Sequence, residues 1–265
     1  MRKAIRRHIL PCGSCLRRLA GSAIVVAVAT WAAPASAYRP FDGTDAAVAD
    51  PGEVEIELQP AGVRRDDTQK TLVAPATVFN LGLPQEWEAV LEGQVETPFS
   101  PAGRSSLAAT GAFLKHVLRD GSLQDKTGPS IATEFGLLLP EVHGDSRIGA
   151  SISGIVSQRF DWGTIHLNAA AALLRDHNAD FFLDAIVEGP ITWKVRPVAE
   201  VFYEDEIGGS HTVSALVGAI WQARENLSFD VGIRHALTDG RPVDEFRAGV
   251  TFGFPLGLFA SPGHK

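Results

Sequence analysis

The sequence has 265 residues, 45% of them hydrophobic, and a formal net charge of −7. Beyond residue 37, no stretch approaches the roughly 18 consecutive apolar residues of a membrane-spanning helix, which excludes a helical membrane protein. The acidic balance offers no basic surface, which argues against a nucleic-acid partner.

Residues 1–37 have the pattern of a cleavable signal peptide. Six Lys and Arg residues precede a mostly apolar run over 20–33, and Ala35, Ser36 and Ala37 match a small-residue cleavage site. The apolar run is shorter than the about 20 residues that a spanning helix needs, so cleavage is favoured over a membrane anchor. The mature chain would begin at Tyr38.

Removal of this segment changes the composition of what remains. The segment contains six of the 24 basic residues and none of the 31 acidic ones, so the remaining 228 residues carry a net charge of −13. Cys12 and Cys15 are both lost. The mature chain therefore has no disulfide and no thiolate metal site.

From residue 53 onward, apolar and polar residues alternate in short runs. Val54, Ile56 and Leu58 fall on one face of the first run, and glutamates fall on the other. A period of two is typical of a β-strand and cannot be segregated by a helix. Twelve such runs are predicted, at 53–63, 71–82, 86–97, 106–118, 129–140, 147–159, 164–174, 180–189, 193–204, 211–222, 227–237 and 243–254.

These runs predict an all-β protein, an antiparallel up-and-down transmembrane β-barrel of about twelve strands. A mean of 19 residues per run and connection suits strands of about 9–11 residues that cross a bilayer at a tilt. The predicted organisation is a signal peptide over 1–37, a periplasmic N-terminal segment over 38–52, the barrel over 53–254 and a C-terminal extension over 255–265.

Two further patterns favour a membrane barrel over a soluble β-sandwich. With the N-terminus in the periplasm, connections after even-numbered strands should be short and those after odd-numbered strands longer, as at 236–242; the stretch 119–128 is an exception. The remaining tryptophans, Trp87, Trp162, Trp193 and Trp221, all lie beside turns assigned to one rim. Indole rings favour the boundary between lipid and water, so these residues predict an aromatic girdle.

The polar face of a membrane barrel must line its interior, because the apolar face meets lipid. An interior of mixed charge could be a salt-bridged filling that supports the barrel, or a thin aqueous path with a preference for cations. The predicted lumen-lining residues of greatest interest are Glu88, Glu92, Glu96, Arg159, Asp184, Arg196, Glu200, Asp230, Arg234 and Arg247.

The stretch from Arg39 to Val48, followed by the run from Pro51 to Leu58, resembles the start of a family of outer-membrane barrels labelled as part of the meta-pathway of phenol degradation. That resemblance implies an outer-membrane location and passage of small aromatic or other hydrophobic compounds. It implies no catalytic or binding residues. One departure is that residues 255–265 follow Phe252 and Phe254, whereas such barrels usually end on the aromatic residue read by the assembly machinery.

The sequence carries no motif of known catalytic chemistry. The sequence contains no G-x-S-x-G elbow, H-E-x-x-H motif or P-loop, and we expect no enzyme activity, cofactor or metal. His166 and Asn168 share a predicted face near Ser151, Ser153 and Ser157, which is the residue set of outer-membrane phospholipases. Because this face points inward, away from lipid, a lipid-directed enzyme is the weaker hypothesis.

The leading hypothesis is an outer-membrane channel or transporter for small solutes. Its expected partners are outer-membrane lipid, the barrel-assembly machinery and a solute that the sequence does not identify. The alternatives are a structural or surface-interaction barrel without transport, and a periplasmic β-barrel binding protein.

Overall fold

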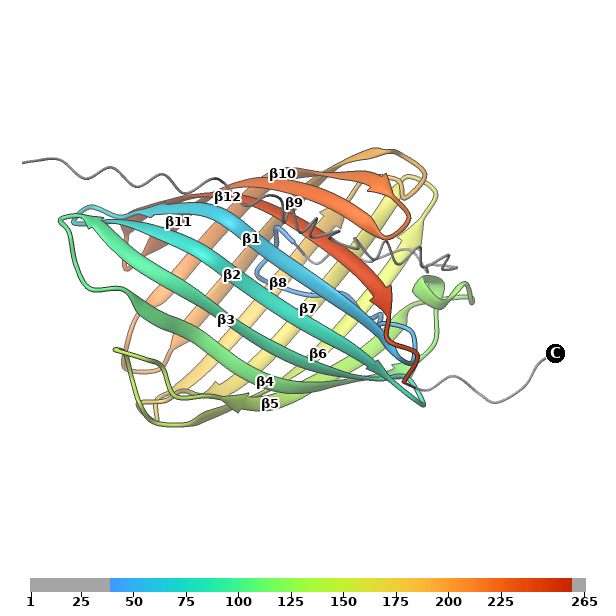
Figure 1. Ribbon diagram of the computed structural model, residues 1–265, viewed down its shortest axis with the longest axis horizontal. Coiled ribbons are helices and arrows are strands. Elements are labelled where there is room, and N and C mark those ends of the chain that lie inside the picture. Colours follow the sequence, from blue (N-terminus) through green and yellow to red (C-terminus); the bar gives the residue numbers. More distant parts are fainter. Residues whose placement is uncertain (1–38, 259–265) are drawn as a thin grey trace, which may run out of the picture. The chain divides into compact units, whose positions relative to one another are not determined.

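The computed structural model describes residues 39–258, and residues 53–255 form one closed antiparallel β-barrel (Figure 1). Each strand pairs with its neighbours in the chain, and the first pairs with the last to close the ring. The predicted twelve-strand barrel is confirmed, whereas the predicted signal peptide lies outside the described residues. The strands are β1 (Glu53–Arg65), β2 (Lys70–Leu83), β3 (Trp87–Ser100), β4 (Ser106–Arg119), β5 (Ser130–Leu138), β6 (Gly149–Phe160), β7 (Gly163–Leu173), β8 (Ala179–Glu188), β9 (Val195–Glu206), β10 (His211–Arg224), β11 (Leu227–Thr238) and β12 (Arg241–Pro255).

The outer face of the barrel is apolar and the inner face is polar. Val217 and Ile233, opposite one another on β10 and β11, are 62% and 60% exposed. Glu57 and Lys115 are each only 1% exposed, since they point into the ring. A contiguous apolar surface around a whole barrel is the surface that a bilayer covers. No helix among residues 39–258 is long and apolar enough to cross a membrane.

Two prolines within the strands lie at interruptions of the backbone pairing. Pro60 falls where the β1–β12 register shifts, and Pro75 falls where the β2–β3 register shifts. Proline has no N–H to donate, so it is tolerated in a sheet at bulges and edges. Pro75 lies within the run predicted over 71–82, which does form β2.

The predicted difference in loop length is only partly correct. The clearest error is the stretch 236–242, expected to be a long loop: β11 and β12 continue through it and leave the two-residue turn Asp239–Gly240. Both residues have positive φ, 51° and 75°, as a tight hairpin turn requires. An Asp-Gly pair strongly favours such a turn, and this local signal outweighs the spacing argument.

The predicted exception, the long connection after the fourth strand, has a structural role. It contains a short 3₁₀ helix, η1 (Ser122–Gln124), which packs against β5 and β6. We call this end of the barrel, which carries the connections after even-numbered strands, the turn end. The other is the loop end.

The four tryptophans lie at the turn end, as the sequence predicted. Trp87 begins β3, Trp162 and Trp193 lie in connections, and Trp221 is near the end of β10. Trp162, Trp193 and Trp221 have half or more of their surface exposed. Their position at one rim of an apolar wall is that of an interfacial girdle.

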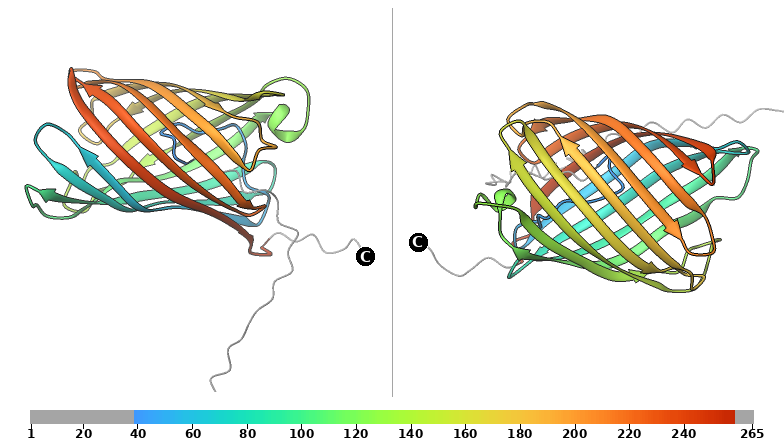
Figure 2. Two further views of the ribbon diagram at one scale, coloured as in Figure 1. Left: turned by 90° about the horizontal axis from the view of Figure 1, so that it is seen from above. Right: turned by 180° about the vertical axis from the view of Figure 1, so that it is seen from behind.

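Residues 39–52, which we call the lumen segment, lie inside the ring of strands (Figure 2). The sequence predicted a periplasmic segment ahead of the barrel and did not anticipate this position. The lumen segment contains no strand or helix, and it joins β1 at the turn end, where Gly52 N donates to Gly82 O at 2.8 Å. Gly82 is required for this approach, because a Cβ there would overlap the backbone oxygens of Ala49 and Asp50.

Candidate functional site: the barrel lumen

The ten residues predicted to line the lumen all lie on inward-facing strand positions. Six of them are buried: Glu88, Asp184, Arg196, Glu200, Asp230 and Arg247. Glu92 and Arg234 border an internal cavity, and Arg159 borders a second one. Glu96 forms a two-pronged ion pair with Arg64 of β1, with N–O distances of 3.1 and 2.6 Å. The structure thus brings most of them around the lumen segment, which the sequence analysis did not include in the site.

The firmest charged anchor of the lumen segment is Asp42. Its Oδ1 accepts a hydrogen bond from Arg247 Nη2 at 2.8 Å and lies 3.6 Å from Arg234 Nη1. Arg247 also donates to the carbonyl of Pro40, and Glu245 pairs with both arginines. Burial alone would raise the pKa of the Asp42 carboxyl, but attraction to Arg247 and Arg234 outweighs burial and holds the pKa below its ordinary value.

A second anchor lies next to this one, where wall side chains accept backbone N–H groups. Glu200 Oε1 accepts from Asp42 N at 2.7 Å and from Gly43 N at 2.9 Å. Asn168 Oδ1 accepts from Thr44 N at 3.2 Å, while its Nδ2 donates to Asp184 Oδ2 at 3.0 Å. A Cβ at position 43 would overlap the Asp184 carboxylate, so only glycine fits here without a shift.

A third anchor holds Ala46, which is fully buried against Ala132 and Ile155. Ala46 N donates to Ser157 Oγ at 2.9 Å, and that oxygen lies 2.8 Å from His166 Nδ1. His166 Nε2 lies 3.4 Å from Glu188. A hydroxyl both accepts and donates, so Ser157 links the lumen segment to this histidine–carboxylate pair in the wall.

The connection between β4 and β5 holds the same residue from the turn end. Gln124 of η1 donates from Nε2 to the carbonyl oxygen of Ala46 at 3.0 Å. Leu123 packs on the apolar cluster that contains Ala46. The unusual length of this connection is thereby explained, since it reaches into the lumen.

Further contacts extend the lumen segment across the full width of the barrel. Lys115 of β4 lies 3.7 Å from Asp45 and donates to Thr44 Oγ1 at 3.3 Å. On the opposite wall Arg39 lies 3.7 Å from Asp230. Two wall glycines leave room here, because a Cβ at Gly249 would overlap Arg39, and one at Gly232 would press on Pro40.

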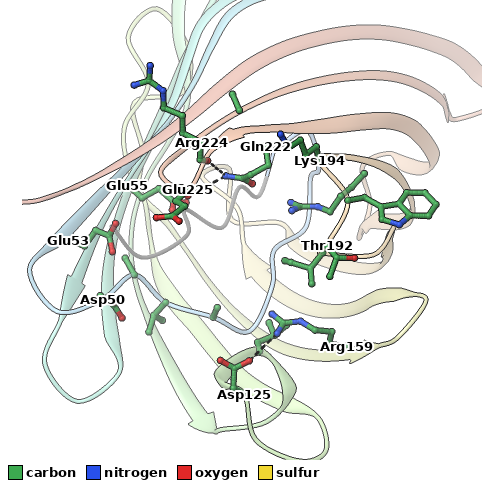
Figure 3. A pocket seen from close by; sticks show the side chains of 18 of the residues that line it. Asp50, Glu53, Glu55, Asp125, Arg159, Thr192, Lys194, Gln222, Arg224 and Glu225 are labelled. Atoms are coloured by element: carbon green, nitrogen blue, oxygen red, sulfur yellow. Dashed lines mark hydrogen bonds and ion pairs between the residues drawn. The ribbon is translucent and has the colours of Figure 1, made fainter. Parts of the chain in front are cut away.

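The lumen segment separates two internal cavities. The turn-end cavity has a volume of about 660 Å³ and is bordered by residues 47–50 of the segment (Figure 3). The loop-end cavity has a volume of about 540 Å³ and is bordered by residue 39 and residues 41–44. Glu88 borders both. The lumen is therefore hollow on either side of the segment and narrowed by it.

Acidic side chains outnumber basic ones around both cavities. In Figure 3, Glu53, Glu55 and Glu225 gather on one side of the turn-end cavity, and Arg159 and Lys194 lie across from them. The charged residues around the loop-end cavity are acidic Asp42, Glu57, Glu88, Glu92, Glu134 and Glu204 and basic Arg39, Lys115 and Arg234. A confined space with excess negative charge concentrates cations.

No cluster of three or more potential metal ligands occurs among residues 39–258. Ser157, His166 and Glu188 form a chain that resembles a nucleophile, base and orienting carboxylate. Ser157, however, is 0% exposed and its oxygen already accepts the Ala46 N–H.

The apolar outer wall, the closed ring and the charged hollow interior define the class of protein: a transmembrane β-barrel. No protein-family model and no curated protein sequence matches the chain.

Solved structures do match its fold. The KdgM porin superposes with a TM-score of 0.53 at 12% identity, covering 76% of this chain and 99% of that one. The NanC porin superposes with a TM-score of 0.55 at 7% identity, covering 75% and 98%. A further KdgM porin structure, in complex with disordered oligogalacturonate, gives 0.52 at 13% identity, covering 76% and 99%. At these identities the likeness shows the fold alone.

Proposed function

We propose that this protein is an outer-membrane channel that passes small solutes, with a preference for cations. One observation carries the proposal: an apolar wall encloses a lumen that contains two cavities, and acidic side chains outnumber basic ones around both. A filling that only supported the barrel would leave little internal space. The outer-membrane location is supported by the predicted signal peptide and by the porin fold.

Conductance in planar lipid bilayers tests the channel. We expect discrete current steps and, in a KCl gradient, a reversal potential that favours K⁺. Replacing Glu92→Gln together with Glu134→Gln should lower the K⁺ preference, because both residues border the loop-end cavity. The loop variant Asp66→Asn serves as control. Absence of current both from the full chain and from a folded barrel that lacks residues 39–49 would disprove the channel, and a preference for Cl⁻ would disprove the charge argument.

A finer proposal concerns aromatic or other hydrophobic solutes, as the family resemblance implies. Four phenylalanines, Phe41, Phe113, Phe182 and Phe202, border the loop-end cavity and offer flat apolar surfaces to a ring. Uptake of phenol and of glycerol, a polar solute of comparable size, into liposomes provides the test when the rate for protein-free liposomes is subtracted. Equal permeation rates of the two would contradict an aromatic preference.

We propose that the protein is not an enzyme and that Ser157 and His166 stabilise the lumen segment instead. A barrel that only binds surface partners remains the second candidate function. The absence of conductance together with partner binding by the loops would select it. Cell fractionation separates both from a periplasmic binding protein, because only the latter would be soluble without detergent.

Assembly of the barrel is proposed to depend on the last strand. Phe252 and Phe254 lie near the end of β12. This strand ends at Pro255, where the predicted extension begins. The described part of that extension runs to residue 258. We infer that the barrel-assembly machinery reads these aromatic residues internally. Loss of outer-membrane insertion in a Phe252→Ala, Phe254→Ala variant would support this, and normal insertion would contradict it.

A further inference from the structure

We propose that the lumen segment, residues 39–52, is a built-in plug that closes the channel when docked and opens it by leaving the lumen. This inference rests on the channel function proposed above and adds its regulation. It is drawn from the contacts of the segment, which differ in kind from those within the wall.

The docked segment obstructs the lumen because it reaches both sides. Lys115 of β4 holds Asp45 on one side, and Glu200 of β9 accepts the Asp42 N–H on the other. These two wall strands lie nearly opposite in the ring, since β5, β6, β7 and β8 separate them along its shorter arc. The cavities that remain lie on opposite sides of the segment along the barrel axis, so a solute crossing the barrel has to pass the segment.

The wall is shaped to receive the segment. Glycines stand where its backbone or side chains approach most closely: Gly82 beside Ala49 and Asp50, Gly249 beside Arg39. The charges are also complementary, since Asp42 and Asp45 meet wall cations and Arg39 meets the carboxylate of Asp230. A segment that entered the lumen without a dedicated site would show neither match.

The same contacts make docking reversible. Among the described residues, the segment has no β-ladder with the wall and is held mainly by side chains that water or solute ions can replace. Only Ala46 is buried in an apolar cluster. The predicted cleavage after Ala37 leaves the N-terminal end of the segment free. The other end is anchored to the wall at Gly52. The segment can therefore leave while the twelve strands stay paired.

A disulfide lock tests the plug directly. A Cβ at Gly43 meets the side chain of Asp184, so Gly43→Cys with Asp184→Cys brings two sulfurs within bonding range, for which Cβ atoms lie about 3.8 Å apart. The mature chain has no native cysteine to interfere. We expect oxidation to lower bilayer conductance severalfold and a reductant to restore it, whereas the conductance of either single-cysteine variant should not respond to oxidant or reductant. Equal conductance before and after confirmed disulfide formation would overturn the proposal.

A variant that lacks residues 39–49 provides the opposite test. Heat-modifiable gel mobility first establishes that its barrel is folded. We expect severalfold higher unit conductance or open probability than in the full chain. If the full chain and the shortened variant conduct equally, the plug is disproved and the channel stands. If neither conducts, the proposed channel function itself fails.

Discussion

The barrel wall and the lumen segment are built from the same chain but held by different forces. Each wall strand is hydrogen-bonded through its backbone to two neighbours, and the ring has no open edge. The lumen segment has irregular backbone and depends on side-chain contacts such as Ser157 with Ala46. A backbone ladder in lipid has no competing solvent, whereas a contact in a polar lumen competes with water. The wall strands, which face lipid, therefore stay paired, whereas the lumen segment, which lies in polar surroundings, can be released.

The largest effect is expected in the wall. Ile233 lies mid-strand on β11 and is 60% exposed on the outer face. Ile233→Arg should lower the free energy of unfolding in lipid vesicles by ~2–4 kcal/mol, because a cation would enter the hydrocarbon layer. Leu237→Arg, nearer the rim, should cost only ~0–1 kcal/mol. Denaturant titration checks both. Equal, negligible costs would show that the outer face meets water.

The charged anchor of the lumen segment should come next. Asp42→Ala removes the carboxylate that pairs with Arg247 and Arg234. Hydrogen bonds to charged groups contribute about 1.5–3 kcal/mol. Since ~1.4 kcal/mol is tenfold, the closed-to-open ratio in bilayers should fall by about tenfold or more, with the barrel equally resistant to unfolding.

Asp66 provides the matched control for that variant. Its carboxylate accepts hydrogen bonds from Thr68 and Gln69 in its own β1–β2 turn, outside the lumen. Asp66→Asn should leave the closed-to-open ratio unchanged. If both variants opened the channel alike, the effect would belong to loss of surface charge rather than to release of the segment.

A smaller effect is expected at the buried third anchor. Ser157→Ala removes the acceptor of the Ala46 N–H, and a neutral hydrogen bond contributes about 0.5–1.5 kcal/mol. The closed-to-open ratio should fall by roughly two- to tenfold. Ser214→Ala is the matched control, because the Ser214 hydroxyl is buried but has no hydrogen-bond partner among the described residues. A larger change in the control than in Ser157→Ala would refute this anchor.

The smallest effect of all is expected from acidification near neutral pH. Asp42 faces Arg234, Arg247, Glu200 and Asp184, and docking lowers its pKa below the ordinary value of 3.8. The Asp42 carboxylate therefore contributes fully to docking above pH 3.8. This contribution is lost as the pH falls through the lower pKa of the docked state. Open probability attributable to Asp42 should stay flat at neutral pH and rise only in strong acid.

The comparison that isolates this effect is between the full chain and Asp42→Asn. The asparagine variant lacks the ionisable group, so its open probability should show a weaker rise in acid. Identical acid profiles in the two proteins would assign the response to other carboxylates of the lumen.

Much of the wall was predictable because its signals are local. The alternation of Val54, Ile56 and Leu58 with glutamates predicted the first strand, and the spacing of such runs predicted twelve. The error at 236–242 comes from the loop-length pattern, which the local turn signal of Asp239 and Gly240 outweighs. The inward position of the ten lumen residues followed from the period of two. The residues that they contact could not be predicted from this period.

The sequence by itself determined the closed wall, because side-chain period and bilayer thickness leave few other ways to bury these strands. Only the tertiary structure decided that residues 39–52 occupy the lumen. The contacts that hold them join positions far apart in the chain, such as Asp42 with Arg247. An irregular segment carries no periodicity, and its place depends on a cavity whose shape and charge exist only after twelve strands have closed into a ring.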